Sequence, residues 1–164
     1  MENAKRMEIL SLIERDARLK PEQIATMIGE TPEAVAAVIH ELEAAHAILQ
    51  YTAVVDWDRA GGTQVTALIE VKIAPQRDTG FDRLAERIAR FPEVRSCYLM
   101  SGAYDLTVEV QAANLREVAR FVSERLSTIE GVSAAATHFV MKRYKHDGIL
   151  YESGDGDERL AVTP

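Results

Sequence analysis

The first fifty residues carry apolar positions at helical spacing in three successive segments. Each segment has one apolar face, made of Ile9, Leu10 and Ile13, then Ile24, Ala25 and Ile28, then Val35, Val38, Ile39 and Leu42. Pro21 and Pro32 suit the first turns of the second and third helices. Gly29 can take the left-handed conformation of a tight turn, and Thr31 is the expected N-cap of the third helix. The pattern predicts a three-helix, winged helix-turn-helix-like module over residues 1–50.

The segment after this module predicts an extended linker. Residues 48–56 suit a strand or an extended connection, and Gly61-Gly62 is the most favourable domain boundary. We therefore expect a strand linker over residues 51–63, with Trp57 as an aromatic that packs near the hinge. A second domain is expected over residues 64–146.

The apolar period changes from helical to alternating in this second domain. Alternation predicts strands at residues 65–73 and 106–110, and apolar runs predict strands at 94–100 and 133–141. Helices are expected from Phe81 to Ile88 and from Asn114, which forms a capping box with Glu117. The second of these helices is expected to bury Leu115, Val118, Val122 and Leu126.

The resulting order is βαββαβ, and similar corners at residues 91–94 and 129–132 indicate an internal repeat. This order predicts a ferredoxin-like sheet with helices on one face, within an α+β fold. The other face of such a sheet needs a cover, which oligomerisation usually provides. Residues 147–164 are acidic and glycine-rich, so we expect a disordered tail.

Composition indicates a soluble globular protein. The 164 residues are 47% hydrophobic and 27% charged, with a net charge of −7. The single Cys97 excludes an intrachain disulfide and fits a reducing cytoplasm, and its apolar surroundings favour a packing role. No stretch is long and apolar enough to span a bilayer or resembles a cleaved signal. We expect a cytoplasmic protein without a membrane partner.

The charge of the helix-turn-helix conflicts with its scaffold. Residues 21–58 contain no lysine or arginine and seven carboxylates. DNA-binding helices obtain most of their affinity from cations that displace counterions from phosphates. The net charge of the whole chain likewise disfavours nonspecific adhesion to nucleic acid.

Several segments together resemble the Lrp/AsnC family of transcription regulators, over about residues 5–145. The segments are Ile9-Leu10, Ile24-Ala25, Gly29, Val35, Ile39, Leu42, Ile48, Tyr51, Val54-Val55-Asp56, Phe91-Pro92-Glu93-Val94, Ser101-Gly102-Ala103-Tyr104-Asp105-Leu106, Gly131-Val132 and Thr137. The resemblance implies a DNA-binding module and a second domain that dimerises, assembles further into octamers in many members, and binds small effectors such as amino acids. This chain departs from the family on the exposed side of the third helix, where Ala36, Ala37, His40 and Glu41 replace basic or polar residues, and His46 replaces a glycine.

The candidate DNA contacts are few. They are Arg18, Lys20, Thr31, Glu33, Ala37 and His40, with Lys5, Arg6 and Arg15 as further cations. Helix N-terminal amides and Thr31 can hold a phosphate without lysine. Weak contact strengthened by oligomerisation is one hypothesis. The alternative is a sensing or protein-interaction module that has lost DNA binding.

The candidate effector site is the turn from Ser101 to Asp105. Gly102 allows close backbone approach, turn amides can accept a carboxylate, and Asp105 can pair with an ammonium group. These chemistries suit an amino acid, and the resemblance adds Tyr104 and Thr137 to the site. The alternative is an ordinary hairpin in which Asp105 caps the turn.

Other chemistry is sparse. His40, Glu43 and His46 do not share one helical face, so a solvated surface explains them better than a metal site. His138 suits a packed or interface position, and Lys142, Arg143, Lys145 and His146 form a basic group that can touch DNA or the acidic tail. The sequence has no phosphate loop, paired-cysteine motif or nucleophile–base arrangement. We expect neither enzymatic activity nor a cofactor.

Overall fold

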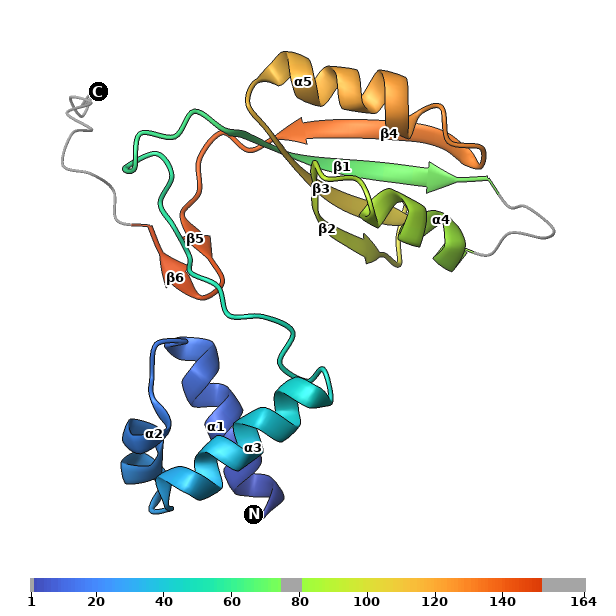
Figure 1. Ribbon diagram of the computed structural model, residues 1–164. Coiled ribbons are helices and arrows are strands. Elements are labelled where there is room, and N and C mark those ends of the chain that lie inside the picture. Colours follow the sequence, from blue (N-terminus) through green and yellow to red (C-terminus); the bar gives the residue numbers. More distant parts are fainter. Residues whose placement is uncertain (1, 75–80, 152–164) are drawn as a thin grey trace, which may run out of the picture. The chain divides into compact units, whose positions relative to one another are not determined.

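The computed structural model describes residues 2–74 and 81–151. The chain divides into two compact units, residues 1–54 and residues 55–164 (Figure 1). The split falls between Val54 and Val55, ahead of the expected boundary at Gly61-Gly62.

Three helices form the first unit: α1 (Asn3–Arg15), α2 (Pro21–Ile28) and α3 (Pro32–Ala44). Their apolar faces meet in one core, made of Ile9, Ile13, Ile24, Ala25, Val35, Val38 and Leu42. The helical period of the sequence therefore identified the buried faces correctly. No strand lies within residues 2–54, so the expected winged character has no counterpart in this unit.

The turn between α2 and α3 has the predicted chemistry. Gly29 ends α2 in the left-handed conformation at φ 66°, where a side chain would be strained. Thr31 begins α3, because its hydroxyl accepts a hydrogen bond from the Ala34 N–H at 3.2 Å. After α3, His46 takes a left-handed φ of 54°, a conformation that glycine adopts with less strain.

The second unit contains a four-stranded antiparallel sheet. Its strands are β1 (Val65–Ile73), β2 (Val94–Leu99), β3 (Leu106–Ala112) and β4 (Val132–Phe139), in the order β2-β3-β1-β4. Helix α4 (Phe81–Ala89) lies between β1 and β2 in sequence, and α5 (Leu115–Arg120) with its π-helical continuation η1 (Phe121–Leu126) lies between β3 and β4. This is the predicted ferredoxin-like α+β fold.

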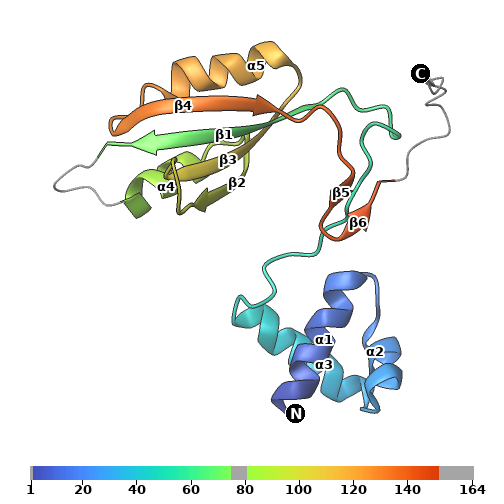
Figure 2. The ribbon, with the colours of Figure 1, turned by 180° about the vertical axis from the view of Figure 1, so that it is seen from behind.

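The helices cover one face of the sheet. Leu84 and Ile88 of α4 pack with Val118, Phe121 and Leu126 of α5 and η1 in a single core. From the sheet this core receives Ala67, Ile69, Val71, Leu106, Val108 and Val110. Figures 1 and 2 show the sheet in two opposite views, and α4 packs against β2.

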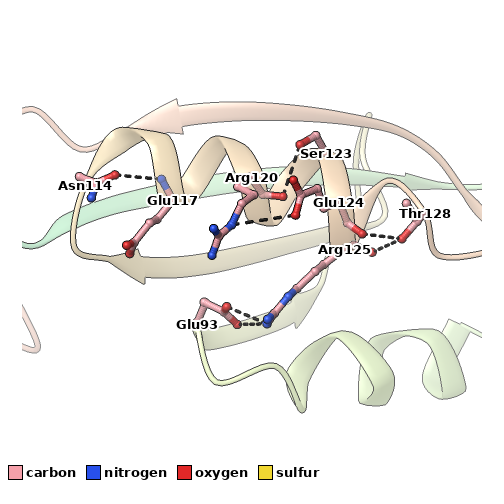
Figure 3. Close-up of polar contacts among 8 residues, drawn as sticks. All are labelled: Glu93, Asn114, Glu117, Arg120, Ser123, Glu124, Arg125 and Thr128. Atoms are coloured by element: carbon pink, nitrogen blue, oxygen red, sulfur yellow. Dashed lines mark hydrogen bonds and ion pairs between the residues drawn. The ribbon is translucent and has the colours of Figure 1, made fainter.

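Helix α5 begins at the predicted cap, but its continuation η1 differs from the regular helix that the sequence predicts. Asn114 Oδ1 accepts from the Glu117 N–H at 3.0 Å, which is the expected cap (Figure 3). Leu115, however, is 56% exposed, so its predicted burial is wrong. The segment continues with π-type bonding, in which the Ser127 N–H donates to the Val122 carbonyl. The wider turn brings Phe121 and Leu126 to the buried face and leaves Val122 only partly buried.

Two expectations about the connections need correction. Residues 51–63 contain no strand, because no neighbouring segment pairs with them among the described residues. Instead the chain from Asp56 to Gly62 forms a hydrogen-bonded turn, in which the Gly62 N–H donates to the Trp57 carbonyl at 2.7 Å.

The second correction concerns the tail. Residues 145–150 form a hairpin of β5 (Lys145–His146) and β6 (Ile149–Leu150), so the expected disordered tail cannot begin at residue 147. Its remainder, residues 152–164, lies outside the described residues. Within the described ranges, no helix has the length and apolar character that crossing a membrane requires.

Candidate functional site

The exposed face of α3 is the first candidate site. Glu33, Ala36, Ala37, His40 and Glu41 all lie on this face, opposite the buried valines and leucine. Alanine provides no hydrogen-bonding group, and glutamate repels phosphate. In the absence of any basic side chain, His40 is the single group on this face that can donate to a base edge or phosphate.

Two ion pairs neutralise carboxylates near α3. The Arg6 guanidinium of α1 donates to Glu41 at 2.6 Å, and the Lys5 ammonium donates to Glu30. The hydrogen bond from Arg6, with the attraction of its charge, lowers the pKa of Glu41. The hydrogen bond to Glu30 chiefly raises the pKa of Lys5. Sequence reasoning treated Arg6 and Lys5 as phosphate contacts, whereas both cations are paired within the module.

The remaining candidate DNA contacts lie at helix ends. Arg18 lies in the turn before α2, where its N–H donates to Asp16 Oδ1 at 2.9 Å, and Lys20 is the N-cap residue of α2. Neither side chain forms an ion pair with a described residue, so both charges remain available. The Thr31 hydroxyl accepts from its own helix, and that lone pair is therefore occupied.

The loop from Ser101 to Asp105 is the second candidate site. It connects β2 to β3 and is closed by a hydrogen bond from the Met100 N–H to the Asp105 carbonyl at 2.8 Å. The backbone N–H groups of Ser101 to Tyr104 donate to no acceptor in the described part of the chain. Gly102 has a φ of 154°, and a Cβ there would meet no atom within 4 Å. Backbone conformation, and not close approach of another group, therefore favours glycine at this position.

Opposite charges flank these amides. Asp105 Oδ2 accepts from the Ile73 N–H at 2.7 Å, where the pairing of β1 with β4 shifts register. Its Oδ1 forms no hydrogen bond with a described group. The Lys72 ammonium donates to the Ala103 carbonyl at 3.2 Å. The loop therefore offers a cation, unpaired amides and a carboxylate oxygen, which are the groups that bind a zwitterion.

Sequence reasoning missed Lys72, because 31 residues separate it from Ala103. The alternating pattern of β1 indicates only that Lys72 points away from the core.

Thr137 does not join this loop within one chain. Thr137 lies on β4 and pairs with Ile69 of β1. Strand β1 separates β4 from β3, the strand that follows the loop. Two strand spacings place Thr137 about 10 Å from the Asp105 side of the sheet. Tyr104 lies in the loop itself, and its side chain is partly exposed.

The remaining candidate residues have local roles. The Glu43 carboxylate accepts a hydrogen bond from the Tyr51 hydroxyl at 2.7 Å, and this bond links the segment after α3 to the helix. Burial, with this hydrogen bond to a carboxylate, raises the pKa of Tyr51 to about 12.

Cys97 is partly buried, and this burial raises the pKa of its thiol. His138 lies 3.3 Å from Glu70 on the uncovered face of the sheet. Among the described residues, no three potential ligands converge as a metal site.

Known proteins resemble this chain along most of its length. Residues 66–150 match the Lrp/AsnC ligand binding domain. The HTH-type transcriptional regulator YugG of Bacillus subtilis is 47% identical over 161 residues, which cover 98% of this chain and 97% of that protein. A proline dehydrogenase transcriptional activator of Rhizobium radiobacter is 25% identical over 143 residues, covering 87% and 91% of the two chains.

Solved structures share the fold. A transcriptional regulator of Neisseria meningitidis in complex with L-Met superposes with a TM-score of 0.73 at 24% identity, covering 89% of this chain and 94% of that one. The Escherichia coli AsnC structure has a TM-score of 0.69 at 18% identity and covers 89% and 95%. These relatives are transcription regulators by name and not enzymes. The match over both units shows that this chain belongs to the Lrp/AsnC family of transcription regulators.

Proposed function

We propose that this chain is an oligomeric DNA-binding regulator whose activity responds to an amino acid bound at the loop from Ser101 to Asp105. The observation that carries the effector assignment is the arrangement at this loop. The loop combines unpaired amides, a Lys72 ammonium that contacts its Ala103 carbonyl, and the free oxygen of Asp105. An α-carboxylate would accept from the amides and Lys72, and an α-ammonium group would donate to Asp105.

L-Methionine is the first effector to test, because the related Neisseria meningitidis structure is an L-Met complex. Titration calorimetry with a panel of amino acids measures binding directly. Two variants separate recognition from folding. Asp105→Asn keeps an oxygen that can accept from the Ile73 N–H but removes the charge, so ammonium recognition is lost while the loop closure remains. Asp105→Ala removes both. Unchanged amino-acid affinity in Asp105→Asn would contradict the assignment.

The proposed oligomer forms through the face of the sheet that the helices leave open. Leu68 in the central strand β1 and Tyr98 in the edge strand β2 are 40% and 57% exposed on this face. Soluble domains usually cover such a surface, and a second copy offers an identical one. Thr137 pairs with the core residue Ile69 and so faces the helical layer, which leaves it outside both this open face and the effector loop of one chain.

The proposed DNA contact is weak. The turn geometry at Gly29 and Thr31 supports the helix-turn-helix assignment, and the cation-free face of α3 supports few phosphate contacts. Oligomerisation would raise the overall affinity by presenting several modules to one DNA. DNA retention at low salt, measured with purified protein and random-sequence duplexes, tests this part.

A second candidate function has its own support. The exposed alanines of α3 and the internal pairing of Arg6 with Glu41 suit a module that binds protein and not DNA. Such a module would retain no DNA at any salt concentration, while amino-acid binding at the loop would persist. The two assays together therefore separate a DNA-binding regulator from a sensor that has lost DNA contact.

A further inference from the structure

Helix α4 carries an exposed row of arginines. Arg83 and Arg87 lie on α4 and Arg90 directly follows its last residue, and all three are exposed while Leu84 and Ile88 of the helix are buried. Together with Glu86 these arginines line a shallow hollow of about 300 Å³. We refer to Arg83, Arg87 and Arg90 as the arginine row.

Most of this charge has no close counter-ion among residues 2–74 and 81–151. Glu86 lies 4.0 Å from Arg90, a distance at the limit of an ion pair, and Arg83 and Arg87 form no ion pair with a described residue. Arg125, on the neighbouring helical segment, is paired more closely, because it donates to both carboxylate oxygens of Glu93 at 2.7 and 2.9 Å (Figure 3). Arg120 lies 4.0 Å from Glu124, the same distance as between Arg90 and Glu86.

The arginine row is not explained by helix stability. Arg83 and Arg87 are four residues apart, and like charges at this spacing destabilise a helix. Cations near the end of a helix interact favourably with its dipole, which accounts for Arg87 and Arg90. Arg83 lies in the first turn of α4, where the dipole disfavours a cation. A bound polyanion would offset both unfavourable terms.

The spacing suits phosphates along a nucleic-acid strand. Arg90 lies seven positions after Arg83, just past the end of α4, and seven helical steps correspond to about 10 Å along the helix axis. With one phosphate per 3.4 Å of axis on each strand, this length faces roughly three phosphates. Guanidinium groups donate in a fork that matches phosphate oxygens. The row also lies on the helical layer, so it stays accessible if a second copy covers the open face of the sheet.

We propose that the arginine row of α4 is a second DNA-contact surface, which binds the phosphodiester backbone without reading sequence. It would supply phosphate contacts that the helix-turn-helix lacks, since residues 21–58 contain neither lysine nor arginine. The inference rests on the proposed DNA-binding function.

The test compares salt dependence in the full chain and two variants, with random-sequence duplex DNA as the probe. The double variant Arg83→Gln/Arg87→Gln removes two unpaired cations from α4. The control Arg120→Gln removes an exposed cation from the same helical layer that already has a carboxylate neighbour. Circular dichroism and size-exclusion profiles verify that the variants keep their fold and assembly.

We expect the slope of log K against log salt to become shallower by about 1.8 for each engaged protomer in the double variant, because each phosphate contact contributes about 0.9. The loss of affinity between about 50 and 200 mM salt would shrink roughly tenfold. Arg120→Gln would behave as the wild type does. An unchanged slope in the double variant, while wild type and control bind DNA, would overturn this inference alone.

Two other results would also overturn it. If the wild type retains no DNA at low salt, the proposed DNA-binding function fails together with the inference. If DNA binding is unchanged but the double variant loses affinity for poly-L-glutamate, the arginine row serves an acidic protein partner instead.

Discussion

The Arg6 guanidinium of α1 donates a hydrogen bond to the Glu41 carboxylate of α3 at 2.6 Å, across 35 residues of sequence. The pair joins the first helix to the face of α3 that a DNA-binding regulator would turn toward DNA. The pair also occupies the Arg6 guanidinium, so this cation is not free to contact phosphate, and the exposed face of α3 has no net positive charge. The proposed weak DNA contact would have two causes, the missing basic residues of α3 and the internal pairing of a cation on α1.

Replacing Glu41 with glutamine should strengthen DNA binding. The substitution removes a charge that repels phosphate and releases Arg6 to donate elsewhere. We expect one further phosphate contact for each module, which steepens the salt slope by about 0.9. A filter-retention series over salt measures this slope.

The matched control is Glu14→Gln, which makes the same charge change at an exposed position of α1 where no ion pair is formed among the described residues. Equal slopes in the two variants would mean that only net charge matters and that the Arg6–Glu41 pair does not limit DNA contact.

Replacing His46 with glycine should stabilise the helical unit. His46 has a φ of 54°, and the left-handed conformation costs a residue with a side chain about 1 kcal/mol. Glycine avoids this strain but loses more conformational freedom on folding, so a net gain of roughly 0.5 kcal/mol is expected. Urea unfolding monitored by helical circular dichroism measures the difference. His46→Ala keeps the strain and should show no gain, and a gain of equal size in that variant would contradict the explanation.

Tyr51 should titrate at unusually high pH. Its pKa is raised to about 12, first by burial and then by its hydrogen bond to Glu43, compared with the ordinary value of 10.0. A raised pKa favours the protonated phenol in the folded state, so the associated stability is complete below pH 10 and is lost as pH rises through about 12. Ultraviolet titration of wild type and Tyr51→Phe isolates this group. Glu43→Gln should lower the pKa only partly, because the partial desolvation of this half-exposed phenol remains, and an unchanged pKa would show that the hydrogen bond has no effect.

Leu68→Glu should weaken self-association. Leu68 lies on the open face of β1, directly opposite Glu109 of β3 and His138 of β4. A second copy packed on this face would bury the new carboxylate beside Glu109, and two like charges in a buried interface oppose assembly. Light scattering after gel filtration measures the mass.

Leu115→Glu is the matched control for this variant, since it introduces the same charge at a leucine that is also exposed but lies on the helical layer. If Leu115→Glu lowers the mass and Leu68→Glu does not, the helices and not the open face form the interface.

The elements whose signals are local were predictable from the sequence. The turn at Gly29 and the caps at Thr31 and Asn114 depend on residues within three positions of one another, and all three have the predicted geometry. Alternation in β1 likewise identified its buried face, because strand burial follows a period of two.

The errors arise where distant residues decide the outcome. The seating of Phe121 against Phe91 joins residues far apart in sequence, and the π-helical segment that begins at Phe121 has no periodic signal. The pairing of Lys72 with the loop at Ala103 and of Arg6 with Glu41 likewise has no periodic signal. The candidate site was therefore located by resemblance and local turn chemistry, while the partners that determine its charge needed the structure.

The salt dependence of DNA binding by the unmodified chain tests the central claim most directly. Fluorescence anisotropy with a random-sequence duplex, measured over a range of salt concentrations, gives the number of phosphate contacts. A regulator with few phosphate contacts should bind at low salt with a slope shallower than about −5 for each engaged protomer, the value expected for fewer than six contacts. No binding at low salt, or a slope of about −6 or steeper for each engaged protomer, would contradict the account.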